Sequence, residues 1–278
     1  MTGSIAQHVE SIHLDNGLRI LVLRRDFAPT FAGYYHFAVG AAHDPRGRSG
    51  IAHLLEHMMF KGTRRLGAVE VEEEGRLLEQ LARTWDRLEE EEDRRGGGDP
   101  AKVAALRREI DDLNRRHRLL VVPNEYAELL SRAGGTGMNA TTSYDLTRYF
   151  VQLPADQLEL WFRLEADRLR RPVFREFHAE RDVVLEERRL RIDNQAEGLG
   201  FEAHRRLLFA AHPYGEPVIG WPHDIRRLRQ EDAEAYFRTW YSPSNCLMVL
   251  VGDVRIDEVR RLAAEHLGGW PRQDLSLI

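Results

Sequence analysis

The stretch GIAHLLEHMMFKGT, residues 50–63, constrains the fold more than any other part of the chain. It places His53, Glu56 and His57 within five residues, in a run that is otherwise rich in Leu, Met and Phe. On a helix, side chains four residues apart lie on one face, with their Cβ atoms about 5–6 Å apart. Burying two imidazoles and a carboxylate among apolar residues without partners is costly. The stretch therefore predicts a helix whose two imidazoles share a partner.

Two imidazoles in this arrangement match half of a zinc site. Each can bind Zn²⁺ through a ring nitrogen at about 2.0–2.1 Å. Glu56 lies beside their face, where a carboxylate can take a proton from water that zinc has made more acidic. The order His-x-x-Glu-His is the inverse of His-Glu-x-x-His and is typical of inverzincins. The alternative is a core helix with incidental polar residues, and the apolar neighbours weigh against a solvated helix face.

A catalytic zinc needs a third protein ligand, and chemistry alone does not choose it among the other acids and histidines. The segment AERDVVLEE, residues 179–187, contains candidates. Its Glu180 and Glu187 are seven residues apart and share a helix face, whereas Glu186 points about 100° away. Acids on an apolar helix face need something to neutralise them, and a metal with its surrounding residues would do so.

The remainder of the chain alternates predicted strands and helices. Residues 9–25 predict two strands joined by a turn at DNG. Residues 212–225 are rich in Pro and Gly and predict a loop. Interspersed strands and helices indicate an arrangement of packed layers. Further strands are predicted at residues 30–42, 134–154 and 245–254, and further helices at residues 156–171, 174–195, 230–241 and 257–270.

Residues 68–122 differ from the rest in being dense in charge. Apolar residues recur there at helical intervals on both sides of the breaker GGGDP. The pattern predicts an antiparallel helical hairpin with a solvated outer surface, and a docking arm for a partner is the alternative. The periodic apolar positions are Leu77, Leu81, Trp85, Leu88, Leu106, Ile110 and Leu113.

Composition narrows the class of partner and compartment. The formal net charge of -5 gives no electrostatic case for nucleic acid. Cys246 is the one cysteine, so neither an intrachain disulfide nor a cysteine metal cluster is expected. No window approaches the ~18 apolar residues of a membrane span. Because a basic segment followed by an apolar one is missing at the N-terminus, a cytoplasmic location is expected, or a periplasmic or secreted one if a signal peptide was removed.

In their order along the chain, these motifs resemble the pitrilysin/insulinase family of zinc metallopeptidases, which includes mitochondrial processing peptidase. The resemblance implies an α+β fold, with helices on a mixed, largely antiparallel sheet. Residues 1–278 would form the metal-binding half of a clamshell, with residues 68–122 as an inserted hairpin. The matching blocks are LDNGLRILV, GRSGIAHLLEHMMFKGT, GGTGMNATTSYDLTRYFVQLP, ERDVVLEE, HPYGEPVIGWPHDI and WYSPSNCLMVLVGDV.

The resemblance assigns a role to each residue of the expected metal site. His53 and His57 are implied as zinc ligands, and Glu187, the last residue of ERDVVLEE, as the third. Glu56 is implied as the general base. Glu180 takes the place of the acid that steadies a ligand. The inserted hairpin makes the separation of His57 and Glu187 much longer than is usual in the family.

The resemblance also implies a peptide substrate and a second wall for the site. Asn139 and Ala140 fall where family members present backbone and amide groups to an extended substrate, although Asn in a Gly-rich turn is also an ordinary turn former. The peptide is expected to add as a strand to a sheet edge. Family members have two homologous halves or are dimers, and the second half supplies an Arg and a Tyr that have no counterpart here. A second half or subunit, in a homo- or heterodimer, is therefore the expected partner.

The expected function is zinc-dependent endopeptidase action on peptides or small unfolded proteins. The alternative is a non-catalytic or zinc-binding scaffold subunit of a related complex. The complete set of His53, Glu56 and His57 disfavours that alternative. A zinc carrier is a third class, and it would gain nothing from Glu56.

Overall fold

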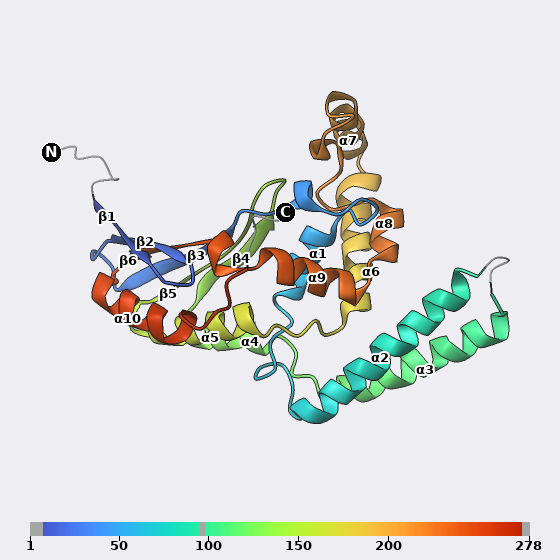
Figure 1. Cartoon of the computed structure of the whole chain (residues 1–278), viewed down its shortest axis with the longest axis horizontal. Helices are drawn as coiled ribbons and strands as arrows, with labels where there is room; N and C mark the ends of the chain where they lie inside the picture. Colours follow the sequence, from blue (N-terminus) through green and yellow to red (C-terminus); the bar gives the residue numbers. More distant parts are fainter. Residues whose placement is uncertain (1–7, 95–97, 274–278) are drawn as a thin grey trace.

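The computed structural model describes residues 8–94 and 98–273 of the chain (Figure 1). Part of the predicted GGGDP breaker and the N-terminal residues used to predict the location lie outside these ranges. Within them, no helix combines the length and the apolar character needed to cross a membrane.

Among the residues described, six strands form one sheet in the order β1-β2-β6-β3-β5-β4. The first two strands make the hairpin predicted at DNG. Strands β2 and β6 are parallel, and every other neighbouring pair is antiparallel. The predicted mixed, largely antiparallel sheet is thus confirmed. The strands are β1 (Val9–His13), β2 (Arg19–Arg24), β3 (Thr30–Phe37), β4 (Thr136–Thr142), β5 (Thr147–Pro154) and β6 (Cys246–Gly252).

Helices α5 (Leu158–Arg170) and α10 (Ile256–Leu267) cover one face of the sheet (Figure 1). Trp161 of α5 is fully buried and stacks on Tyr35 of β3, with ring centroids 5.1 Å apart. A Cβ atom at Gly33 would lie 2.4 Å from the Trp161 ring, so the glycine makes room for the indole. This packing centres the main core on β3, the strand between β6 and β5.

A second group of helices lies at the β4 end of the sheet (Figure 1). Helix α1 (Ile51–Met58) contacts β4, α6 (Phe177–Arg188) and α9 (Gln230–Trp240). Helix α8 (Pro222–Arg227) packs against α6, so the loop predicted for residues 212–225 is wrong at its C-terminal end. Pro222 opens α8, a position where the missing N–H of proline costs nothing.

Besides α8, two described helices were not predicted, α4 (Glu125–Arg132) and α7 (Ala196–Leu208). The first turns of α7 contain Gly198 and Gly200, and glycine disfavours a helix, which hides α7 in the sequence. Helix α6 continues as a π-helical turn, Arg189–Asp193. The remaining short 3-10 turns are Ala41–His43, Ala155–Gln157, Pro213–Gly215 and Pro243–Asn245.

Helices α2 (Val71–Glu92) and α3 (Pro100–Arg118) form the predicted helical pair, which extends away from the sheet (Figure 1). They share a hydrophobic cluster that is separate from the main core. The division of the chain into a peptidase domain and an insertion at residues 68–122 stays a prediction. The buried residues of the cluster shared by α2 and α3 are Leu77, Leu81, Leu88, Leu106, Ile110 and Leu113.

Candidate metal centre

The N-terminus of α1 is held by contacts from outside the helix. Gly50 precedes the helix with φ of +90°, and a Cβ atom there would lie 2.6 Å from the carbonyl oxygen of Ile219. The two carboxylate oxygens of Asp44 accept the N–H groups of Gly50 at 2.7 Å and Ala52 at 3.2 Å. Asp44 therefore acts as a capping side chain from six residues upstream, and it fixes where α1 begins.

The three predicted ligands converge between α1 and α6. His53 Nε2 lies 3.8 Å from Glu187 Oε2, and His57 Nε2 lies 3.5 Å from the same oxygen. One donor atom from each of the three lies within 4.8 Å of the others. Ligand atoms around a tetrahedral zinc with bonds of about 2.0–2.2 Å lie about 3.3–3.6 Å apart, so the spacing suits one shared ion after small adjustments. That these residues bind a metal stays a prediction.

The two imidazoles sit in different electrostatic surroundings. Burial, with the neighbouring His57, lowers the pKa of His53 to about 4, so His53 is neutral at pH 7. Its buried Nδ1 has no hydrogen-bond partner in the described part of the chain. Burial also lowers the pKa of His57, but hydrogen bonds to Glu180 and Glu187 outweigh it and raise that pKa to about 9. A cation is thus favoured where the imidazoles face Glu187, and a metal ion would take the place of the proton.

Glu180 orients the second imidazole. Its Oε2 lies 3.2 Å from His57 Nδ1, so a proton on Nδ1 leaves Nε2 free to face Glu187. Its other oxygen lies 2.5 Å from Lys61 Nζ. Burial raises the pKa of Glu180, but the hydrogen bonds from His57 and Lys61 lower it to about 2. Glu180 is therefore a carboxylate at neutral pH, as a residue that steadies a ligand must be.

Glu56 lies beside the imidazoles in a nearly closed environment. Its residue exposure is 9%, and burial raises the pKa of its carboxyl group. The hydroxyl of Thr142 in β4 donates to Glu56 Oε2 at 2.5 Å. A carboxylate with a raised pKa accepts a proton more readily than an exposed one does, which suits a general base.

Three partners of the site were missed from the sequence. Arg191 Nη1 lies 2.6 Å from Glu187 Oε1, and Lys61 and Thr142 contact Glu180 and Glu56. Arg191 follows Glu187 by four residues, so helical spacing could have indicated that contact. Lys61 lies beyond the end of α1 and contacts Glu180 on α6, so local spacing does not indicate its role. No local signal connects Thr142 with Glu56, because that contact joins a strand to a helix.

A cavity of about 860 Å³ borders the candidate ligands and β4. Asn139 and Ala140 both line it, and they belong to the edge strand. Asn139 is exposed and lies within β4, so it is not a turn residue. Its Oδ1 accepts the N–H of Ala140 at 2.9 Å. The structure thus brings both residues to the site, and a role in binding substrate stays a prediction.

Two family models match the chain. The model described as insulinase (peptidase family M16) matches residues 25–79 and 121–220, which are more than half of the chain. The model described as peptidase M16 inactive domain matches residues 227–277. The first match omits residues 80–120, which include most of the α2–α3 pair.

Several proteins of similar sequence or structure are named as proteases or peptidases. The zinc protease PqqE of Helicobacter pylori is 27% identical over 97% of this chain and 49% of its own length. A probable mitochondrial-processing peptidase subunit beta of Arabidopsis thaliana is 25% identical over 88% of this chain and 36% of its own length. The crystal structure of a protease from Helicobacter pylori superimposes with a TM-score of 0.72 and 26% identity, over 96% of this chain and 51% of that one.

The chain spans about half the length, or less, of these relatives. The expected resemblance is confirmed by the family match, the relatives and the shared fold together. On this evidence the chain belongs to the insulinase family, peptidase family M16.

Proposed function

We propose that this chain is the metal-bearing half of a zinc-dependent metallopeptidase that hydrolyses peptide bonds. The observation that carries the proposal is the convergence of His53 and His57 of α1 with Glu187 of α6, which lies 130 residues after His57, with Glu56 beside them. The names of relatives as zinc proteases favour zinc as the metal. A neutral His53 and an ionised Glu187 make a donor set that zinc commonly takes.

Glu56 and Glu180 have different roles in the proposed hydrolysis. Bound zinc would make a water molecule acidic near neutral pH and polarise the scissile carbonyl group. Glu56, held by Thr142, takes the proton from the attacking water and later gives it to the leaving amine. Glu180 holds the ring of His57 in place throughout.

The edge strand β4 provides a place for an extended peptide. A strand at the edge of a sheet has one row of backbone N–H and C=O groups that no neighbouring strand pairs. A peptide added there would be bound through its backbone, which tolerates varied side chains. Since residues 139–142 of β4 line the cavity beside the candidate ligands, the added peptide would pass the metal site.

A second half or subunit is part of this proposal. The chain spans about half the length of its relatives, and α7 exposes several large apolar side chains, of which Phe201 lines the cavity. An exposed apolar patch of this kind favours a protein contact. The exposed residues are Leu199, Phe201, Leu207 and Leu208.

A zinc-binding subunit without activity is the second candidate. It is favoured by the match of residues 227–277 to a model described as an inactive domain. That segment contains none of the residues gathered at the metal centre. Glu56 has no task in a subunit that only binds zinc, and its buried position beside the imidazoles favours the peptidase.

Metal analysis and a cleavage assay test the proposal together. The chain should bind one equivalent of zinc, and His53→Ala should abolish that binding, whereas His204→Ala on the exposed α7 should not. Peptide cleavage should appear when the polypeptide that completes the relatives' length is supplied. A chain that takes up no zinc would contradict the proposed site. Zinc binding without cleavage in the completed enzyme would favour the inactive subunit.

A further inference from the structure

We propose that the helical pair α2–α3 positions the metal centre by holding α6 against α1. Helix α6 carries Glu180 and Glu187, whereas α1 carries both histidines. The helical pair would thus set the distance between the two sources of ligands. This inference rests on the proposed zinc site, and it gives a structural task to the charged segment at residues 68–122.

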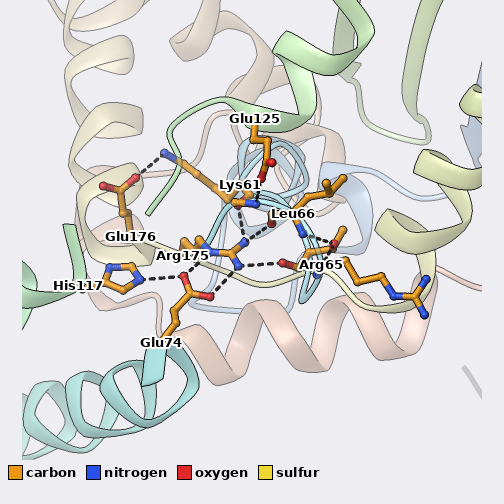
Figure 2. A network of polar contacts seen from close by, with 10 residues as sticks. Lys61, Arg65, Leu66, Glu74, His117, Glu125, Arg175 and Glu176 are labelled. Carbon is orange, nitrogen blue, oxygen red and sulfur yellow. Dashed lines mark hydrogen bonds and ion pairs between the residues drawn. The ribbon is translucent and has the colours of Figure 1, made fainter. Parts of the chain in front are cut away.

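The first contact is made by Arg175, which precedes α6 and is 1% exposed. Figure 2 shows its guanidinium between Glu74 of α2 and the segment that follows α1. Its Nε and Nη2 donate to the two carboxylate oxygens of Glu74 at 2.5 and 2.7 Å. Its Nη1 donates to the carbonyl oxygens of Lys61 and Leu66 at 2.9 and 3.0 Å, and Nη2 donates to that of Thr63 at 2.8 Å.

The second helix of the pair joins the same contact. His117 of α3 is 2% exposed, and its Nε2 lies 3.2 Å from Glu74 Oε1 (Figure 2). A buried ion pair is stable only if its remaining donors and acceptors are satisfied, and Glu74 and Arg175 meet that condition here. The end of α2 nearest the sheet is therefore joined directly to Arg175, and the matching end of α3 is joined to it through Glu74.

Lys61 connects this contact to the metal site. Its carbonyl oxygen accepts from Arg175, and its Nζ lies 2.5 Å from Glu180 and 3.3 Å from Glu176. Lys61 comes three residues after the end of α1, and Glu176 comes directly before α6. A displacement of Arg175 would therefore move both the exit of α1 and the entry of α6. Through Glu180, it would also move the ring of His57.

Two further contacts join α2 to α6. The ring of Trp85 in α2 stacks on that of His178, with centroids 3.8 Å apart. Glu89 lies 3.5 Å from Arg181 and 2.6 Å from Arg229. Two residues along an α-helix correspond to a rotation of about 200°. Since His178 faces α2, Glu180 lies on the opposite side of α6. Helix α6 is thus placed between the helical pair and α1.

The helical pair also has internal contacts that are separate from those to α6. It has a hydrophobic cluster of its own, and many of its exposed charges pair within the hairpin. An appendage that only extended into solvent would have no use for a buried Glu74 and Arg175. Their burial is accounted for if they fix the position of α6.

A double variant tests this inference. Glu74→Gln with Arg175→Gln removes both charges, so neither is left buried alone, but it loses the Arg175 bonds to the three carbonyl groups. Its zinc dissociation constant, measured by competition with a chelator, should rise at least about tenfold, as it does when residues that support ligands are changed. The matched control is Glu79→Gln with Arg83→Gln, an exposed pair 3.0 Å apart on the same helix, which should keep the original affinity.

The outcomes separate this inference from the proposed function. If the unaltered chain binds no zinc, the proposed site fails and this inference fails with it. If the unaltered chain binds zinc and the folded double variant binds it with the same affinity, only the inference is overturned. Circular dichroism establishes that the variant is folded.

A measurement on the unaltered chain decides the case in which the double variant does not fold. Linkage between two sites is reciprocal, so zinc should stabilise the contacts that stabilise its site. Zinc should slow amide hydrogen exchange in residues 61–67 and 71–76, as well as in α6. Residues 100–106, at the far end of the pair, should be unaffected. Equal exchange at residues 71–76 with and without zinc would overturn the inference.

Discussion

Glu56 differs from the two histidines beside it in having a hydrogen-bond donor already in place. Thr142 holds one of its oxygens, and burial raises the pKa of the carboxyl group. Glu56→Gln keeps the shape and the bond partner but cannot take a proton. In the completed enzyme this variant should retain one equivalent of zinc and lose about 10²–10⁴-fold in kcat.

The control for this variant is Glu186→Gln, which removes an exposed charge from α6 outside the cavity. It should leave both zinc content and kcat unchanged. Metal analysis and peptide hydrolysis provide the two readouts. Full activity of Glu56→Gln would remove Glu56 from the role of base.

His57 makes the stability of the zinc-free chain depend on pH. Its pKa in the folded chain is about 9, above the unperturbed value of 6.5, because Glu180 and Glu187 face its ring. The charged ring therefore stabilises the fold fully below about pH 6.5, and that contribution is lost as pH rises through about 9. Denaturant unfolding of the zinc-free chain should show this decline.

The decline between pH 6.5 and 9 should be smaller in His57→Gln. His204→Gln, which changes an exposed histidine of α7, should follow the unaltered chain. If the curves of His57→Gln and the unaltered chain ran parallel over this range, His57 would not be the group responsible.

At the scale of elements, the helices and strands in which apolar residues recur with a strong period were predicted best from the sequence. The pair α2–α3, the sheet and α1 follow from repeated apolar positions and from the turn at DNG. Helix α7 was missed because it contains Gly198 and Gly200, which disfavour a helix, and α8 was missed because of its Pro and Gly neighbours.

The candidate site was predictable in part. The pairing of His53 and His57 followed from their spacing, whereas the choice of Glu187 depended on resemblance to a family. Contacts such as Thr142 with Glu56 could not be predicted, because only the tertiary fold brings β4 to α1.

The start of α1 depends on Gly50. Its φ of +90° is unfavourable for any residue with a Cβ atom, and that atom would lie 2.6 Å from a backbone oxygen of Ile219. Gly50→Ala should therefore lower the free energy of unfolding by more than about 1 kcal/mol. Since α1 carries both histidines, the affinity for zinc should fall as well.

Gly75→Ala is the matched control for Gly50→Ala. Gly75 lies inside α2, where an added Cβ atom would meet no other residue within 4 Å, so alanine there should raise the free energy of unfolding by about 0.5–1 kcal/mol. Denaturant titration measures both variants. A Gly50→Ala chain as stable as the unaltered one would show that the position tolerates a side chain.

At the scale of the whole molecule, two surfaces remain without a partner in the described part of the chain. The edge of β4 offers backbone groups beside the metal site, and α7, whose Phe201 lines the same cavity, offers exposed apolar side chains. A second half that packed on α7 would stand across the cavity from β4. The peptide would then lie between the sheet edge and the second half, which would restrict the active site to extended chains.

The role of α7 can be separated from the effect of surface hydrophobicity alone. Leu207 on α7 and Leu119 after α3 are both 82% exposed. With the second half supplied as a separate chain, Leu207→Ser should weaken association because it removes apolar area from the contact, about 25 cal/mol for each Å² buried. Leu119→Ser makes the same chemical change far from α7 and should leave association unchanged. Sedimentation of the mixed chains measures both. Equal weakening by the two variants, or none by Leu207→Ser, would place the second half elsewhere and leave α7 as an exposed helix.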